Sequence, residues 1–232
     1  MNILKKIQPL VGLATLISLA VGLWYVYRAP ADFQQGGAVR ILYIHVPSAK
    51  LALLSYIFLT IASILYLWKR YEGADILAEA AASVGAAFTV ITLASGSIWG
   101  KPMWGTWWAW DARLTSMLVL LILYKGLMVL RHSLDDPVKG ARATAVLAIV
   151  GAVDLPIIHY SVVWWRTLHQ PPSLTASENT AIHIAGPLLP PLLILSVAFI
   201  LMGLYMLTVK ARQIEARRHL DALEAARMHH DD

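Results

Sequence analysis

The stretch WGKPMWGTWWAWDARLTS, residues 99–116, places five tryptophans within the thirteen residues from Trp99 to Asp111. It also contains Gly100, Pro102 and Gly105, and long apolar runs precede and follow it. Glycine and proline are the residues that most disfavour a helix interior. We therefore expect a non-helical connection that joins two apolar helices and carries a cluster of aromatic rings.

Outward from this stretch, the chain consists mainly of apolar runs. Of its 232 residues, 58% are hydrophobic and 14% are charged, a composition typical of polytopic membrane proteins. A helix of about 20 apolar residues crosses a bilayer. We predict six such helices, at residues 9–27, 46–68, 76–98, 114–130, 143–161 and 184–209. The predicted fold class is all-α: a bundle of six transmembrane helices in a single domain, residues 1–209, followed by a charged helical tail, residues 210–232.

Lysine and arginine predict the orientation, because they are enriched in cytoplasmic segments. One side of the predicted membrane carries Lys5, Lys6, Lys69, Arg70, Arg131, Lys139, Arg142 and the basic residues of 210–227. The other side carries fewer: Arg28, Arg40, Lys50, Lys101, Arg113 and Arg166. Both termini are therefore expected in the cytoplasm and the tryptophan-rich stretch on the outer side. The net charge of +5 reflects this bias and does not indicate a nucleic-acid partner.

The chain has no cysteine. This excludes disulfides, iron–sulfur clusters, thiolate ligation and covalent haem attachment through a thioether on this chain.

Two explanations compete for the tryptophans. Trp24, Trp68, Trp164 and Trp165 suit an interfacial aromatic belt, since each lies near a predicted helix end. Five rings in one connection exceed what a belt requires. Aromatic faces provide stacking area for a flat apolar ligand, and the glycines allow a backbone to approach it closely. We favour a ligand platform.

Two histidines lie on the same predicted side as this platform. His45 stands in ILYIHVPSAK at the start of the second apolar run, and His169 stands in VVWWRTLHQPPS beyond the fifth. A lone histidine at a helix end is usually a hydrogen-bonded interface residue, but a pair beside a flat aromatic surface suggests haem, because neutral imidazole is a common axial ligand of haem iron. The propionates would pair with cations, for which the candidates are Arg40, Lys101, Arg113 and Arg166.

The tryptophan-rich stretch resembles the WWD signature of haem-handling membrane proteins. Together with LYIHVPSA and LPIIHYSVVWWRTLHQ, in this order, it identifies the chain as a member of the CcmC family of cytochrome c maturation proteins. The resemblance implies haem b held on the periplasmic face of the bacterial inner membrane, with His45 and His169 as axial ligands. Residues implied for the haem platform and the chaperone-facing surface are Trp99, Trp104, Trp107, Trp108, Trp110 and Asp111.

The resemblance also implies partners. The haem would pass to the membrane-tethered haem chaperone CcmE, within a complex that contains the ABC transporter subunits CcmA and CcmB and the small membrane protein CcmD. In such a role the chain is a holder and transfer protein rather than an enzyme. Asp111 is a conceivable general acid, but we favour a role in anchoring its loop through hydrogen bonds.

Other ionisable groups leave the ligand assignment open to competition. His159 lies near the outer end of the fifth run, and Asp154 lies deeper in the same run, with Pro156 between them. For His159 we favour hydrogen bonding, with Asp154 or with another helix, over ligation. His183 is an additional outer-side histidine, and Lys50 could reach a propionate.

Two further functions stay open. In a bis-histidine cytochrome b the ligands project into the bundle at depth, whereas His45 and His169 lie at helix ends. An ABC-type haem permease would need a polar conduit, for which only Asp154 stands out among the spans. A cytochrome would keep its haem, a haem donor would release it to a chaperone, and a permease would bind none stoichiometrically.

Overall fold

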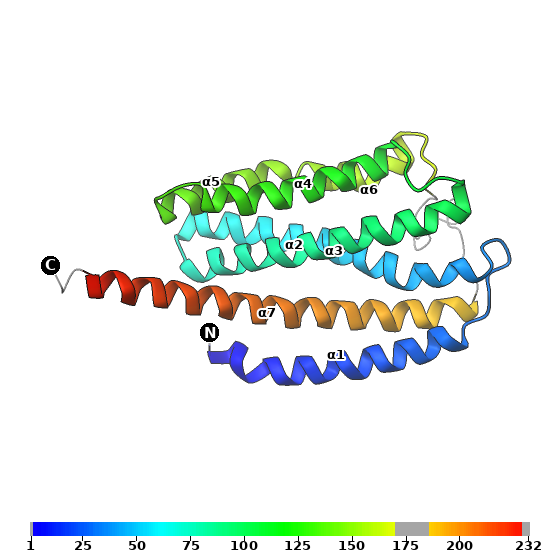
Figure 1. The fold of residues 1–232 in the computed structure, drawn as a ribbon, viewed down its shortest axis with the longest axis horizontal. Coiled ribbons are helices and arrows are strands. Elements are labelled where there is room, and N and C mark those ends of the chain that lie inside the picture. Colours follow the sequence, from blue (N-terminus) through cyan, green and yellow to red (C-terminus); the bar gives the residue numbers. More distant parts are fainter. Residues whose placement is uncertain (1, 170–185, 229–232) are drawn as a thin grey trace.

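The computed structural model describes residues 2–169 and 186–228 (Figure 1). These residues form α-helices and short 3-10 turns without a β-sheet: α1 (Asn2–Arg28), η1 (Gly37–Ile41), α2 (Leu42–Lys69), α3 (Glu72–Trp104), α4 (Ala112–His132), α5 (Pro137–Gly151), α6 (Asp154–Trp164), η2 (Gly186–Leu188) and α7 (Leu189–Met228). Six segments are long and apolar enough to cross a membrane, with α5 and α6 together forming one of them. The prediction of an all-α, multi-pass membrane protein is therefore confirmed.

The helices lie roughly parallel to one long axis (Figure 1). Helix α1 lies against α7, while α2 and α3 occupy the middle and α4, α5 and α6 the opposite side. We name the two ends of the bundle by their contents. The tryptophan end contains the 29–36 and 105–111 connections and the end of α6; the tail end contains the α2–α3 and α4–α5 connections, both described chain ends and the extension of α7 (Figure 1).

The helices extend beyond the predicted spans at most ends. Helix α7 continues without interruption to Met228, which confirms the predicted helical tail. The division of the chain at 209/210 stays a prediction. The fifth span is interrupted at Ala152 and Val153, where α5 ends and α6 begins. Pro156 has no N–H to donate to the carbonyl of Ala152, and this carbonyl instead accepts the N–H of Leu155 at 3.1 Å.

The tryptophan-rich stretch is less irregular than its glycines and proline predict. Helix α3 continues through Gly100 and Pro102 to Trp104, and only 105–111 is non-helical. A Cβ at Gly100 would lie 3.1 Å from the ring of Trp104, so this glycine makes room for the ring rather than ending the helix. Pro102 lies two residues before the last residue of α3, and the helix ends before Gly105, whose φ is 76°. The expectation of a fully broken segment is therefore wrong for residues 99–104.

Small residues bring the central helices close together. Tyr124 of α4 reaches between α2 and α3 and donates its hydroxyl to the carbonyl of Ala52 at 2.8 Å. Gly85 of α3 lies directly against the hydroxyl end of this ring, where a Cβ would clash. Helices in lipid commonly pack through such small residues and interhelical hydrogen bonds. This contact joins α2, α3 and α4 in the middle of the bundle, between its two ends.

At the tail end, charged side chains join three helices. Asp75 of α3 accepts hydrogen bonds from Arg131 of α4 at 2.5 Å and from Arg218 of α7 at 2.8 Å. Glu79, one turn further along α3, pairs with the same two arginines. Side-chain exposure is 7% for Asp75 and 13% for Arg131, so most of this network is out of solvent.

Candidate functional site

His45 and His169 come together at the tryptophan end. His45 lies in the first turn of α2, and His169 lies beyond the end of α6. Their ring centroids are 6.2 Å apart and the ring planes are inclined by 33°. Two residues separated by more than 120 positions thus bring their imidazole rings close together. His183 lies outside the described residues.

Helix α3 orients His45. The hydroxyl of Ser95 lies 3.1 Å from Nδ1 of His45 and donates its own hydrogen to the carbonyl of Ile91 at 2.7 Å. Because the hydroxyl has one hydrogen, its remaining role is to accept from Nδ1–H. In the neutral ring this leaves the lone pair on Nε2. Gly96 gives the ring its space: a Cβ there would lie 2.9 Å from Cε1 of His45.

Two tryptophan rings from the end of α3 flank His169. The ring centroids of Trp99 and Trp104 are 6.4 Å and 6.3 Å from that of His169, and the two indoles meet edge to face at 5.2 Å. The indole N–H of Trp99 donates to Oε1 of Gln35 at 3.1 Å. The 29–36 connection therefore fixes one ring of the aromatic surface beside the histidine pair.

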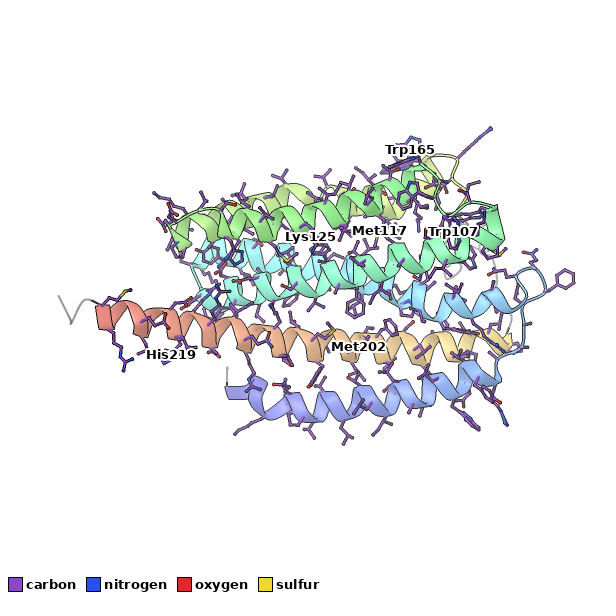
Figure 2. The ribbon with its side chains drawn as sticks, in the orientation of Figure 1. Trp107, Met117, Lys125, Trp165, Met202 and His219 are labelled. Atoms are coloured by element: carbon purple, nitrogen blue, oxygen red, sulfur yellow. The ribbon has the colours of Figure 1, made fainter. Side chains whose placement is uncertain are left out.

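The other three tryptophans lie in the 105–111 connection. Trp107 and Trp110 are 56% and 78% exposed, and Figure 2 labels Trp107 at this end of the bundle. The Trp108 ring lies edge to face with that of Trp110 at 5.5 Å. Its indole N–H is buried and has no hydrogen-bond acceptor among the described residues. An unpaired buried donor is costly, so this N–H could donate to an additional acceptor.

Asp111 and Arg113 connect the start of α4 to the segment that carries His169. Asp111 caps α4 by accepting the N–H of Leu114 at 2.8 Å through Oδ1, and through Oδ2 it accepts the N–H of Leu168 at 3.1 Å. Arg113 donates to the Ser161 hydroxyl at 3.2 Å and to the carbonyl of His159 at 3.1 Å. Asp111 thus anchors two segments by hydrogen bonds.

The predicted propionate partners differ in availability. Arg113 already uses two of its guanidinium nitrogens to hold α6. Lys101 is exposed and donates to the carbonyl of Gly105 at 3.1 Å. Arg40, at the end of η1, and Arg166, beyond α6, are also exposed. Arg40 and Lys101 are therefore freer than Arg113 to meet an anionic ligand.

The competing residues have surroundings of their own. His159 is exposed, and its ring stacks edge to face on Tyr160 at 4.7 Å. Asp154 is buried at the start of α6, and its Oδ2 has no hydrogen-bond partner among the described residues. The predicted Asp154–His159 hydrogen bond is thus absent from the described structure. Lys50 is exposed one turn beyond His45.

Sequence reasoning missed Ser95, Gly96 and Gln35. A usable signal existed for Ser95, since it precedes Trp99 by four residues and so shares its helix face. Gln35 gave no such signal, because its contact spans 64 positions. In residues 2–169 and 186–228, no group of three or more His, Asp or Glu side chains could hold a metal ion.

Comparisons with known proteins agree with the family resemblance of the sequence motifs. The family model CcmC, described as heme exporter protein C, matches residues 1–226. Heme exporter protein C of Bradyrhizobium diazoefficiens is 46% identical over 96% of this chain and 85% of its own length. The protein of the same name from Haemophilus influenzae is 43% identical over 91% of this chain and 85% of its own. A ccmC-like mitochondrial cytochrome c biosynthesis protein of Marchantia polymorpha is 40% identical over 89% of this chain and 87% of its own.

Proposed function

The chain belongs to the CcmC family of heme exporter proteins, and we propose that it holds haem b at the tryptophan end and delivers it to the haem chaperone CcmE during c-type cytochrome biogenesis. Haem handling in cytochrome c biogenesis follows from the family. The observation that carries the residue assignment is the pairing of His45 with His169.

The spacing of the two imidazoles fits a single iron between them. A bond from a metal to an imidazole nitrogen is about 2 Å long, so two imidazoles on opposite sides of one ion have ring centres roughly 6 Å apart. The centroids of His45 and His169 are 6.2 Å apart. Ser95 supports the assignment, because its hydrogen bond leaves Nε2 of His45 as the lone-pair nitrogen.

The aromatic rings divide into two groups in this proposal. Trp99 and Trp104 flank His169 and would line the haem-binding surface, while Trp108 offers its unpaired N–H to an acceptor on the bound molecule. Trp107 and Trp110 are exposed enough to meet the chaperone. Arg40 and Lys101 would pair with the propionates, while Arg113 would act on the site through α6.

The chain would work by positioning. The described residues that surround the histidine pair are mainly aromatic or are held in hydrogen bonds to backbone. Holding haem at fixed height and tilt would give the chaperone a defined approach, a contribution of proximity rather than of chemistry. The chain would also bind CcmA, CcmB and CcmD within one membrane complex.

The proposed location is the bacterial inner membrane, with the tryptophan end on the periplasmic side and both termini in the cytoplasm. The distribution of lysine and arginine supports it, because the tail end carries Lys69, Arg70, Arg131, Lys139 and Arg142 together with the basic extension of α7.

A transfer assay tests the delivery step. The haem-loaded chain in detergent is mixed with haem-free CcmE, and the haem on each protein is followed after separation. We expect transfer from the wild-type chain, slowed about tenfold by Trp107→Ala with Trp110→Ala if these rings anchor the chaperone. Trp68→Ala removes an exposed ring next to the α2–α3 connection at the tail end and should leave transfer unchanged.

Haem that stays on the wild-type chain with CcmE present would contradict the proposal. That result would favour a resident haem, as in a cytochrome b, and reversible reduction by a quinol would then identify it.

A further inference from the structure

A cavity of about 500 Å³ opens at the tail end, at the opposite end of the bundle from the histidine pair. Helices α2, α3, α4, α5 and α7 all contribute to its wall. The buried part of the wall is mainly apolar and also includes the polar side chains of Ser63, Tyr66 and Asp75. Its apolar members are Leu59, Ala78, Ala82, Leu127, Ala141 and Ala145. Its volume lies within the range of small-molecule and cofactor sites.

The charged residues at this cavity leave an excess of positive charge. Four cations line it, Arg131, Lys210, Arg217 and Arg218, against the three carboxylates of Asp75, Glu79 and Asp221. Arg131 and Arg218 are held by Asp75 and Glu79. Within residues 2–169 and 186–228, Lys210 and Arg217 form no ion pair. The ion-pair network that joins the helices therefore does not account for these two cations.

A histidine in a defined tautomer completes the lining. Nδ1 of His132 lies 2.8 Å from the carbonyl oxygen of Met128, one turn earlier in α4. A carbonyl only accepts, so Nδ1 carries the hydrogen and the neutral ring keeps its lone pair on Nε2. A hydrogen bond of this kind commonly orients an imidazole that ligates a metal. The thioether of Met128 lines the same cavity.

We propose that this cavity is a second haem site, which receives haem at the cytoplasmic side. His132 would ligate the iron through Nε2, Lys210 and Arg217 would pair with the two propionates, and the apolar wall would contact the tetrapyrrole edge. The inference rests on the proposed haem-handling function and adds an entry point to it. A phospholipid would also use the cations and the apolar wall, but the oriented imidazole favours a ligand that carries a metal.

Hemin titration of variants separates this site from the one at the tryptophan end. In the full-length chain with His45→Ala and His169→Ala, we expect one remaining hemin to bind with a high-spin spectrum. Adding His132→Ala should weaken this binding by about tenfold or more and change the spectrum. His219→Ala removes an exposed histidine further along α7 and is the matched control (Figure 2).

The propionate contacts are tested with a second probe. Lys210→Gln with Arg217→Gln should weaken hemin binding to the His45→Ala/His169→Ala background and have little effect on hemin dimethyl ester, whose carboxylates are esterified. Native mass spectrometry of the same proteins reports any bound phospholipid.

Three results would overturn the inference. The first is no hemin binding in the His45→Ala/His169→Ala background, and the second is hemin binding in that background whose affinity and spectrum do not change with His132→Ala. The third is a bound phospholipid that is displaced only by the Lys210 and Arg217 changes. The first leaves the proposed function intact. By contrast, wild-type hemin binding that survives loss of His45 and His169 without any change in stoichiometry or spectrum contradicts the ligand assignment of the proposed function and leaves the second site standing.

Discussion

The two ends of the bundle use polar side chains in different ways. At the tail end, charges pair with one another across helices, as Asp75 does with Arg131 and Arg218. At the tryptophan end, Asp111, Arg113 and Lys101 donate to or accept from backbone groups of neighbouring segments. The first arrangement joins helices to helices; the second fixes the backbone that carries His169 and leaves aromatic rings exposed beside it.

This difference suggests a division of work within one bundle. Removing one partner of a mostly buried ion pair leaves the other charge unpaired and destabilises a protein strongly, so the tail end should govern stability. A side chain such as Asp111, which hydrogen-bonds to two separate segments, should contribute less to stability but should fix the position of the segment that carries His169. Four predictions test this division, beginning with the largest effect on stability.

Asp75→Asn should destabilise the protein most. The change leaves Arg131 paired with Glu79, and Arg218 paired with Glu79 and Glu72, and loss of one partner of a buried pair costs about 3–5 kcal/mol. Thermal unfolding in detergent measures the loss. Asp135→Asn, an exposed carboxylate in the α4–α5 connection, is the control. Equal stability of the two variants would mean that the charge network does not hold the tail end together.

Gly85→Ala should have the next largest effect, since it lies in the central layer shared by both ends. The added methyl clashes with the Tyr124 hydroxyl and disturbs its hydrogen bond to Ala52, and overpacking of this kind costs about 1–3 kcal/mol. Gly126→Ala, which would meet no atom within 4 Å, should be neutral or slightly stabilising. The same unfolding assay compares them, and a similar midpoint for both variants argues against the tight α3–α4 contact.

Changes at Asp111 separate capping from positioning. Asp111→Ala removes the cap of α4 and the link to Leu168, and a lost cap costs about 1 kcal/mol. Asp111→Ser restores a capping oxygen without a second one for Leu168. We expect Asp111→Ser to recover most of the stability while hemin affinity stays low in both variants. Recovery of affinity in Asp111→Ser would show that the link to Leu168 does not position His169.

The smallest effect is a pH dependence at Asp136, which caps α5 at the tail end. The backbone N–H groups of Lys139 and Val138 hold the pKa of this carboxyl below 3.8. A folded-state pKa below the unfolded one adds stability above the unfolded pKa, and this stability disappears as the pH falls through the folded value. The stability difference between wild type and Asp136→Asn should be constant above about pH 5 and shrink near pH 4 and below. A difference that grows on acidification would contradict the assigned cap.

The fold was largely predictable because each span is a long apolar run. The predicted runs fall in the helices that the structure describes, apart from Ala152 and Val153 between α5 and α6, and from residues 184 and 185, which lie outside the described residues. Most helices extend beyond the predicted runs. The exception is the end of α3, where Gly100 and Pro102 suggested a break. These two residues do not stop α3, which ends at Trp104, just before Gly105 with its positive φ.

The site was predictable in residue types but not in contacts. The aromatic cluster, the histidines and the family resemblance all pointed to the tryptophan end of the bundle. The bond from Ser95 to His45 spans 50 positions and that from Asp111 to Leu168 spans 57, so both depend on how helices pack. The tail-end network was missed for the same reason, since Arg218 is 143 positions from Asp75.

The central claim is that one haem iron lies between His45 and His169. The most direct measurement is the absorption spectrum of the purified chain, oxidised and reduced, beside His45→Ala and His169→Ala. The account predicts a six-coordinate, low-spin spectrum for the wild type that becomes high-spin or disappears in each variant. An unchanged low-spin spectrum in both variants, or no haem in wild-type protein expressed with ample haem, would contradict it.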